Sequence, residues 1–233
     1  MRQRTKWNAL FSGRTPREIF SSIYENSVWG DNQPGKYYSG LGSHDPQIVE
    51  PYLSSVSDFL KHLTTKPNAV DLGCGDFNVG KRIRPFCDRY IACDIVPKLI
   101  DRNRTSFGEL DVDFKCLDMS EDSLPDGDIV FLRQVLQHMS NDQIAKLTPN
   151  LRKYRWAIVT ESLPVDPNFK PNLDISAGPG IRICRGILED SGVILTAPPF
   201  SLQTVSEQIL CEVRIPHVLI RTYLYEMNRA TER

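Results

Sequence analysis

The stretch Ala69-Val70-Asp71-Leu72-Gly73-Cys74-Gly75-Asp76-Phe77 decides the fold. Apolar residues lead into a Gly-x-Gly turn, which is the pattern of a buried parallel strand that runs into a tight loop. Gly73 and Gly75 have no Cβ, so the backbone there can adopt positive φ and lie close to a ligand. A helix that begins at Asn78 would direct its free N–H groups at the same place. In open α/β sheets, this first strand-to-helix turn is the usual nucleotide-binding position.

Three further apolar runs follow, and each ends in polar residues. The run 90–93 leads to Asp94, nineteen positions after Gly75, and an acid at about this distance is the expected partner of ribose hydroxyls. The run 114–117 leads to Asp118, and the run 128–132 leads to Arg133. The carboxyl ends of parallel strands meet at one edge of the sheet, so we expect these polar residues to surround a ligand site.

The glycine pattern separates the possible nucleotides. A dinucleotide fingerprint requires a third glycine where this chain has Asn78, and a phosphate-binding loop with Lys and Ser/Thr is missing. The combination of the glycine turn, Asp94 and the pair Asp118-Met119 resembles the class I methyltransferases that use S-adenosylmethionine. The resemblance extends from about residue 19 to 226 and is closest to a bacterial-type group of small methyltransferases of unassigned substrate. The segments shared with that group are 21–31, 74–78, 94–100, 133–138 and 197–200.

The resemblance implies one methyltransferase domain over residues 1–233, with an N-terminal helix and lid in 1–45 and a Rossmann-like core in 46–233. It implies a seven-stranded, mostly parallel sheet with an antiparallel last strand and helices on both faces. In that family the glycine loop meets the methionine part of the cofactor, the second-strand acid binds the ribose, and the third-strand acid meets the adenine amine. The cofactor-binding residues expected here are Asp71, Gly73, Gly75, Phe77, Asp94, Ile95, Asp118, Met119 and Arg133. Phe77 stands where longer methyltransferase loops have a third glycine, and the close group also carries phenylalanine there.

Local signals place helices between the strands. Capping boxes start helices at Thr15 and Ser140. Apolar residues at three- and four-residue spacing predict an amphipathic helix over 47–63. Alternating strands and helices favour a parallel sheet with right-handed crossovers. The β-rich runs 206–213 and 217–225 predict a closing antiparallel hairpin.

The composition describes an ordinary globular protein. A net charge of −1 gives no general attraction to nucleic acid or to an anionic membrane, so large nucleic-acid substrates are disfavoured. The six cysteines have no paired spacing, and His44, His62 and His217 have no ligand spacing, so no metal is expected. No apolar stretch reaches membrane-spanning length. We therefore expect a cytoplasmic protein that uses no membrane and no metal.

A glycine-rich, aromatic-rich segment, residues 27–44, precedes the first strand and resembles the lid that methyltransferases place over cofactor and substrate. Trp29 and Tyr38 are the substrate-contact candidates in it, because aromatic rings exclude water and can face a sulfonium. The equally weighted alternative is a surface loop whose aromatic residues pack on the core. A second long loop, 161–180, is rich in proline and glycine, as functional loops often are.

Methyl transfer depends mainly on positioning, and a base is needed only when the acceptor must lose a proton. His138, just past the fourth strand, is the first base candidate; the alternative is a residue bonded to backbone that fixes the substrate wall. Glu161 is the second base candidate. Arg182 is a substrate candidate that could pair with an acidic group, or else form a surface salt bridge. The Asn/Asp-Pro-Pro-Tyr motif of base- and glutamine-methylating enzymes does not follow the fourth strand, which favours a small-molecule acceptor.

The expected function is therefore methyl transfer from S-adenosylmethionine to an oxygen or nitrogen of a small molecule, with S-adenosylhomocysteine as product. Two alternatives remain. One is a nucleotide-dependent oxidoreductase, which Asn78 and the closing hairpin disfavour. The other is a regulatory or interaction module that binds the cofactor without turnover, since a fold that binds does not have to catalyse.

Overall fold

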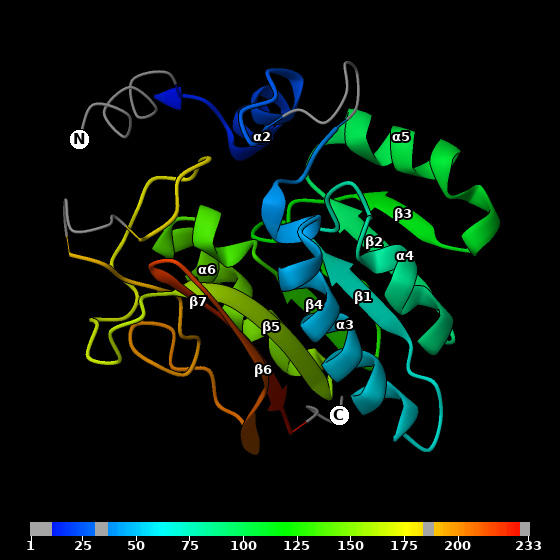
Figure 1. The fold of residues 1–233 in the computed structure, drawn as a ribbon. Helices are drawn as coiled ribbons and strands as arrows, with labels where there is room; N and C mark the ends of the chain where they lie inside the picture. The colour runs from blue at the N-terminus through cyan, green and yellow to red at the C-terminus, as the bar shows by residue number, and fades with distance from the viewer. Residues whose placement is uncertain (1–10, 31–36, 184–188, 229–233) are drawn as a thin grey trace.

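The computed structural model describes residues 11–30, 37–183 and 189–228, and these form one twisted sheet with helices packed around it (Figure 1). Within the described residues the sheet has seven strands in the order β3-β2-β1-β4-β5-β7-β6. The strands are β1 (Ala69–Leu72), β2 (Tyr90–Asp94), β3 (Asp113–Cys116), β4 (Ile129–Arg133), β5 (Trp156–Leu163), β6 (Ser206–Ile215) and β7 (Val218–Glu226). Strands β1 to β5 pair in parallel, and β7 runs antiparallel to both β5 and β6. The expected mostly parallel sheet with a reversed last strand is confirmed, and so is the closing hairpin.

The strand order reverses between β1 and β4. From β1 the chain adds β2 and then β3 on one side, and it returns to place β4 and β5 on the other side. Such a reversal opens a crevice at the carboxyl ends of the strands, because the connections leave in opposite directions. The glycine turn after β1 lies at this crevice.

Helices α2 (Pro16–Glu25) and α6 (Asn141–Leu147) begin where the capping boxes predict. Further helices are α3 (Pro46–Lys61), α4 (Gly80–Ile83) and α5 (Pro97–Ser106), with short 3-10 turns at η1 (Leu41–Ser43), η2 (Arg84–Phe86), η3 (Gly108–Leu110), η4 (Leu136–His138) and η5 (Thr148–Lys153). Both predicted capping boxes are present, at Thr15 and at Ser140. No helix in the described part of the chain is both long enough and apolar enough to span a bilayer.

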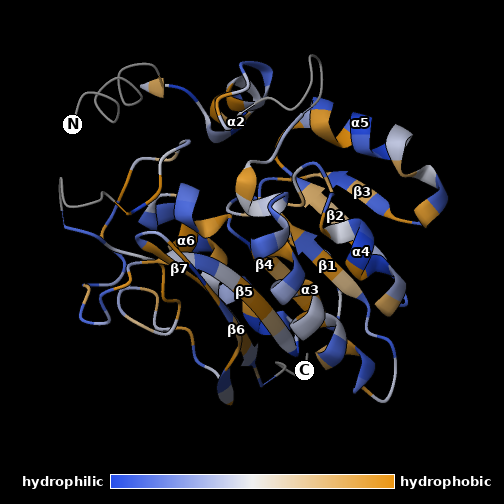
Figure 2. Cartoon of the chain, viewed as in Figure 1, coloured by the Kyte–Doolittle hydropathy of each residue, from blue (hydrophilic) through white to orange (hydrophobic). Residues whose placement is uncertain are grey.

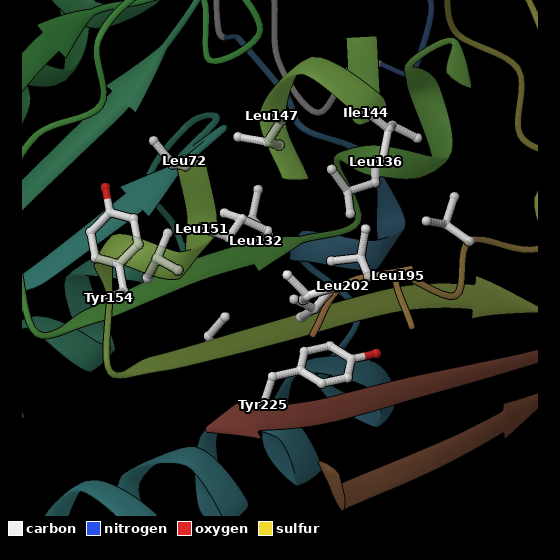
Figure 3. Packing of buried hydrophobic residues seen from close by; sticks show 14 of the residues in the cluster. Leu72, Leu132, Leu136, Ile144, Leu147, Leu151, Tyr154, Leu195, Leu202 and Tyr225 are labelled. Atoms are coloured by element: carbon white, nitrogen blue, oxygen red, sulfur yellow. The ribbon is translucent and has the colours of Figure 1, made fainter. Parts of the chain in front are cut away.

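The two faces of the sheet carry separate hydrophobic cores, because successive strand residues point to opposite sides. Val70 and Leu72 face the cluster that includes Leu136, Ile144 and Leu147, shown close up in Figure 3. Ala69 and its neighbours on the other face pack against α3 through residues such as Val56. Figure 2 shows apolar colour on the central strands and polar colour on the outer side of the helices. The core therefore holds the sheet rigid beneath the crevice.

The helix expected from Asn78 is shorter than predicted and begins later. Phe77 has a φ of +62°, which interrupts a helical path, and α4 is a single turn from Gly80. A Cβ on Gly80 would lie closer than 3.0 Å to the Phe77 ring. Gly80, which comes too late to be a fingerprint glycine, thus makes room for the ring of Phe77. The expectation that a full helix directs its free N–H groups at a ligand is wrong for this turn.

Candidate functional site

A cavity of about 540 Å³ lies at the crevice where the strand order reverses. Its walls come from segments far apart in the sequence: the α2 residues Pro16, Phe20 and Tyr24; Trp29 and residues 39–43 of the lid segment; residues 73–75; Asp94 and Ile95; residues 117–119; residues 133–135 and 137–139; Gln143; and Pro179 and Ile181. The volume falls within the range of about 300–1,000 Å³ typical of small-molecule sites. Helix α2 and the lid segment therefore cover the strand ends; residues 31–36 of that segment lie outside the described residues.

The glycine turn lies between the turn after β4 and the lid segment. Gly73 and Gly75 have φ values of +78° and +56°. A Cβ on Gly73 would lie closer than 3.0 Å to Val135, and one on Gly75 equally close to the Ser39 hydroxyl. Glycine is needed at both positions, because the positive φ and the close neighbours each exclude a side chain.

Asp94, at the end of β2, lines the cavity and is tied to the glycine turn. Its Oδ2 accepts a hydrogen bond from the Gly75 N–H at 3.0 Å, and its Oδ1 accepts one from the Val96 N–H at 3.1 Å. Burial raises the pKa of this carboxyl to about 6, against the opposing effect of the backbone hydrogen bonds. The carboxylate thus stands at the cavity wall with its position set by the backbone.

The remaining strand-end candidates meet at the same cavity. Ile95, Asp118 and Met119 line it, as does Arg133 at the end of β4. Asp118 Oδ1 accepts hydrogen bonds from the backbone N–H and the hydroxyl of Ser120. The Nη2 of Arg133 donates to the Gly42 carbonyl at 2.6 Å, so this guanidinium is bonded to the lid segment.

Two expected cofactor residues do not line this cavity. Asp71 lies within β1, and strand alternation turns it toward the α3 face, where its Oδ2 accepts a hydrogen bond from the Tyr90 hydroxyl at 3.0 Å. Burial raises the pKa of Asp71 to about 7. Phe77 is fully buried, and its ring packs edge-on against Phe107 and Phe114. The structure therefore places both residues in the support beneath the glycine turn, which corrects the expectation that they contact the cofactor.

Asp76 connects the lid segment to the glycine turn, a role that the sequence did not indicate. Its Oδ2 accepts hydrogen bonds from the Ser39 N–H at 2.9 Å and lies 2.6 Å from His44 Nε2. Its own N–H donates to the Ser39 hydroxyl, which also bonds the Tyr24 hydroxyl at 2.9 Å. Burial alone would raise the pKa of Asp76, but the hydrogen bonds outweigh it, led by that of His44, and the pKa is lowered. These contacts join segments 37 positions apart, and no local pattern encodes them.

The two aromatic substrate candidates separate in the structure. Trp29 lines the cavity, and its ring centroid lies 5.0 Å from that of His138. Tyr38 is buried beside the cavity, with its ring 4.5 Å from that of His44, and it is not a lining residue. Trp29 thus follows the lid interpretation, whereas Tyr38 follows the alternative in which aromatic residues of the segment pack inward.

His138 lies at the cavity wall on η4. Its Nδ1 lies 3.1 Å from the Gly180 carbonyl, so Nδ1 carries the proton and donates it. Its Nε2 therefore keeps its lone pair and lies 3.3 Å from the Gln137 amide nitrogen. Burial lowers the pKa of the ring to about 4. The ring is neutral at physiological pH. It has the unprotonated nitrogen that a base requires, and it also has the bond to backbone that the alternative interpretation expects.

Glu161 and Arg182 lie behind the cavity wall, outside its lining. The two Glu161 oxygens accept hydrogen bonds from the N–H groups of Leu136 and Gln137, both at 2.9 Å. Arg182 donates to the carbonyls of Leu136 at 3.1 Å and Met139 at 2.9 Å. Both side chains are almost fully buried. Glu161 bonds N–H groups at η4 and Arg182 bonds carbonyls there, so the two side chains together fix the position of this turn. This placement does not support direct contact of Glu161 with an acceptor proton. It also does not support a direct contact of Arg182 with an acidic substrate.

The comparisons with known proteins agree with this geometry. Residues 69–154 match a family model described as "Methyltransferase domain". N-methyltransferase NodS from Bradyrhizobium japonicum WM9, solved with S-adenosylhomocysteine, superposes with a TM-score of 0.59 at 14% identity over 87% of this chain and 98% of that one. Human N-acetylserotonin methyltransferase with S-adenosylmethionine gives 0.59 at 17% identity over 95% of this chain and 62% of that one. Magnesium protoporphyrin IX methyltransferase from Synechocystis PCC 6803 gives 0.58 at 13% identity over 93% and 99%. A search of curated protein sequences gives no match.

Sequence identities this low establish a shared fold, and the matched family model covers the segment from β1 to the turn that precedes β5. Residues 69–154 therefore carry a methyltransferase-domain signature, and the chain has the fold of the solved methyltransferases named above, as the glycine turn and the strand-end acids indicated.

Proposed function

We propose that this protein binds S-adenosylmethionine in the 540 Å³ cavity and transfers the methyl group to an oxygen or nitrogen of a small-molecule acceptor. The observation that carries the proposal is that Gly73, Gly75, Asp94 and Asp118 line the same cavity as the aromatic lid residue Trp29. S-adenosylmethionine, when bound, supplies an electrophilic methyl group on a sulfonium. The chain's own task is then to hold both molecules in contact and to exclude water.

The residues present fit the cofactor. The two glycines leave a backbone wall that a ligand can approach closely. A carboxylate has about four lone-pair sites, so Asp94 retains acceptor capacity for ribose hydroxyls beyond its bonds to Gly75 and Val96. Asp118, two residues past the end of the neighbouring strand β3, offers a second acceptor for an amine. We assign these two acids the main polar contacts with the cofactor.

The acceptor side is formed by Trp29, His138 and the segment at Pro179. His138 Nε2 is the one basic atom we assign to receive a proton, if the acceptor must lose one. The net charge of −1 and the cover formed by α2 and the lid segment favour a small acceptor over nucleic acid. We further propose that residues 1–233 act as one domain in the cytoplasm.

The test is calorimetric titration with S-adenosylhomocysteine, with NADH in parallel, on the wild type, on two cavity variants and on one control variant. Asp94→Ala and Asp118→Ala are each expected to weaken S-adenosylhomocysteine binding at least tenfold, or ~1.4 kcal/mol. Asp142→Ala is the matched control, because Asp142 lies in an exposed i,i+4 ion pair and does not line the cavity. Binding of NADH with no binding of S-adenosylhomocysteine would contradict the cofactor assignment.

A second candidate function is a module that binds the cofactor without turnover. It is favoured by the lowered pKa of His138 and by the engagement of Glu161 behind the wall, which leave the cavity without a strong base. Radiolabelled S-adenosylmethionine incubated with metabolite and protein extracts separates the two. Labelled product supports the enzyme, and binding with no labelled product under any condition supports the module.

A further inference from the structure

The glycine turn keeps its shape through bonds to its own backbone groups. The N–H groups of Gly73 and Cys74 both donate to the Cys93 carbonyl, at 2.8 and 2.9 Å. The N–H of Gly75 donates to Asp94 Oδ2 at 3.0 Å. Gly75 has a φ of +56°, and a glycine has more backbone freedom than any other residue. The orientation of Gly75 therefore depends on the partners that hold its two polar groups.

The carbonyl of Gly75 is held by Asn103 of helix α5. Asn103 Nδ2 donates to this oxygen at 2.7 Å, and the Asn103 side chain is fully buried. The Cys74 thiol, 3.8 Å from the same oxygen, is a weak donor, so Asn103 supplies the main bond. Gly75 and Asp94 line the cavity, whereas Asn103 is not among the described residues that do. Gly75 thus has Asp94 on its N–H and Asn103 on its carbonyl.

The neighbouring Arg102 fixes the orientation of the Asn103 amide. Arg102 Nη1 donates to Asn103 Oδ1 at 2.9 Å and to the Asp76 carbonyl at 3.0 Å. Since a guanidinium only donates, the Asn103 oxygen faces Arg102 and the Asn103 amide nitrogen faces Gly75. Helix α5 therefore bonds the carbonyls of two successive residues of the glycine turn.

Helix α5 also connects Asn103 to Asp94. Asp94 Oδ1 accepts a hydrogen bond from the N–H of Val96, the residue that caps the start of α5. Asp94 and Asn103 are thus joined by two routes, one through Gly75 and one through the helix. A buried carbonyl that loses its donor is unfavourable, so without the Asn103 amide we expect Gly75 to turn toward another donor. The Gly75 N–H would then move away from Asp94.

We propose that Asn103 is a positioning residue for the cofactor, an inference that rests on the proposed function of the cavity. Asn103 holds the Gly75 carbonyl, and through it the Gly75 N–H holds the Asp94 carboxylate in the orientation that receives the ribose hydroxyls. Asn103 makes no contact with the cofactor itself. A carboxylate that is already oriented binds more tightly, because the cost of ordering it is not subtracted from the affinity.

A double-mutant cycle tests whether Asn103 acts through Asp94. S-adenosylhomocysteine is titrated by calorimetry into the full chain, as the wild type, Asn103→Ala, Asp94→Ala and the double variant. Asn103→Ala is expected to weaken binding at least fivefold, or ~1 kcal/mol, in the wild-type background. In the Asp94→Ala background the same substitution is expected to weaken binding less than twofold. Equal losses in the two backgrounds overturn the proposal.

A second substitution at position 103 guards against a water that replaces the missing amide. Asn103→Leu has the same branching as asparagine and leaves no space for water, so its loss of affinity should equal or exceed that of Asn103→Ala. Losses below twofold in both variants overturn the proposal. If Asn103→Leu does not fold, Asn103→Ala decides alone.

Asn172→Ala is the matched control for a loss of stability. Asn172 is also buried, its amide also bonds backbone carbonyls, those of Ile194 and Pro198, and it is not among the described residues that line the cavity. Its replacement is expected to lower the urea midpoint and to change S-adenosylhomocysteine affinity less than twofold. If Asn172→Ala weakens binding as much as Asn103→Ala does, general destabilisation explains the loss and the proposal is overturned.

Amide hydrogen exchange in the ligand-free protein tests the contact without the cofactor. In Asn103→Ala the exchange of the Gly75 N–H is expected to accelerate at least tenfold more than that of the Val130 N–H in β4, because only the glycine turn has lost a partner. Equal acceleration of the two overturns the role given to Asn103. A wild type that does not bind S-adenosylhomocysteine at millimolar concentration contradicts the proposed function instead, whereas a wild type that binds it and an Asn103→Ala variant that binds equally well contradict only this inference.

Discussion

The buried Arg182 is the residue whose removal tests the account of the cavity wall most directly. Arg182 is 2% exposed, and among the described residues it donates hydrogen bonds to the carbonyls of Leu173 at 2.8 Å, Leu136 at 3.1 Å and Met139 at 2.9 Å, and to Asn141 Oδ1 at 2.9 Å. It also lowers the pKa of nearby Glu161 against the larger effect of burial. This one guanidinium therefore joins η4, the start of α6 and the loop at residue 173.

Arg182→Met keeps most of the side-chain volume and removes every one of these donors. The substitution leaves three buried carbonyls and the Asn141 amide oxygen without the donors that Arg182 supplies. A buried acceptor left unsatisfied costs about 1–3 kcal/mol, so the loss of several such bonds is expected to cost about 3–5 kcal/mol. With a urea slope of about 2–3 kcal/mol/M, the unfolding midpoint is expected to fall by roughly 1–2 M.

The matched control is Arg82→Met, which makes the same chemical change at the surface. Arg82 forms a two-pronged ion pair with Glu50, and both side chains are about half exposed. Exposed pairs of this kind contribute about 0–1 kcal/mol, so the control midpoint should hardly move. If urea unfolding gives the two variants midpoints within the error of each other, the reasoning about the buried network is refuted.

Three other predictions follow from single contacts. Gly80→Ala should destabilise the protein by about 1–3 kcal/mol in urea unfolding, because its Cβ would clash with the packed Phe77 ring, whereas Gly108→Ala, with open space around it, should not. Nitrogen NMR of labelled histidine should show His138 as the neutral Nδ1–H form with no titration above about pH 5, since burial lowers its pKa to about 4; a midpoint near 6.5 would contradict this. Burial raises the pKa of Glu161 from 4.5 to about 8, so unfolding releases its proton between those pH values and stability falls as pH rises through that window. Glu161→Gln should lose less stability than the wild type between pH 5 and 8, and equal losses in the two proteins would refute the shift.

The sequence by itself determined the architecture and the class of cofactor. Each strand is a short apolar run, and each main helix has a capping signal or an apolar stripe. Such local patterns can be recognised in the sequence without knowing which elements pack against them. The glycine turn, Asp94 and Asp118 were identifiable because strand ends of a parallel sheet meet at one edge whatever the details of the fold. Position along a strand was enough to place them.

Side-chain direction was decided by the tertiary structure. Asp71 and Phe77 belong to the same stretch as the two glycines, yet strand alternation turns Asp71 toward α3, and a positive φ directs the Phe77 ring into the core. Glu161 looked like a base at a strand end, but the turn at η4 presents two N–H groups to it and covers it. Spacing along the chain does not indicate which groups contact a buried side chain in the folded structure.

The acceptor side of the cavity also depended on the tertiary structure, because Trp29, His138 and Pro179 come from the lid segment, from η4 and from a loop far along the chain. The contact of Trp29 with Pro179 joins residues 150 positions apart, and the bond of His138 to Gly180 joins residues 42 apart. Only packing brings such segments together, and only their contacts decide which ring nitrogen of His138 keeps a lone pair. Local pattern thus determined what the cavity is built for, and long-range packing determined which side chains face it.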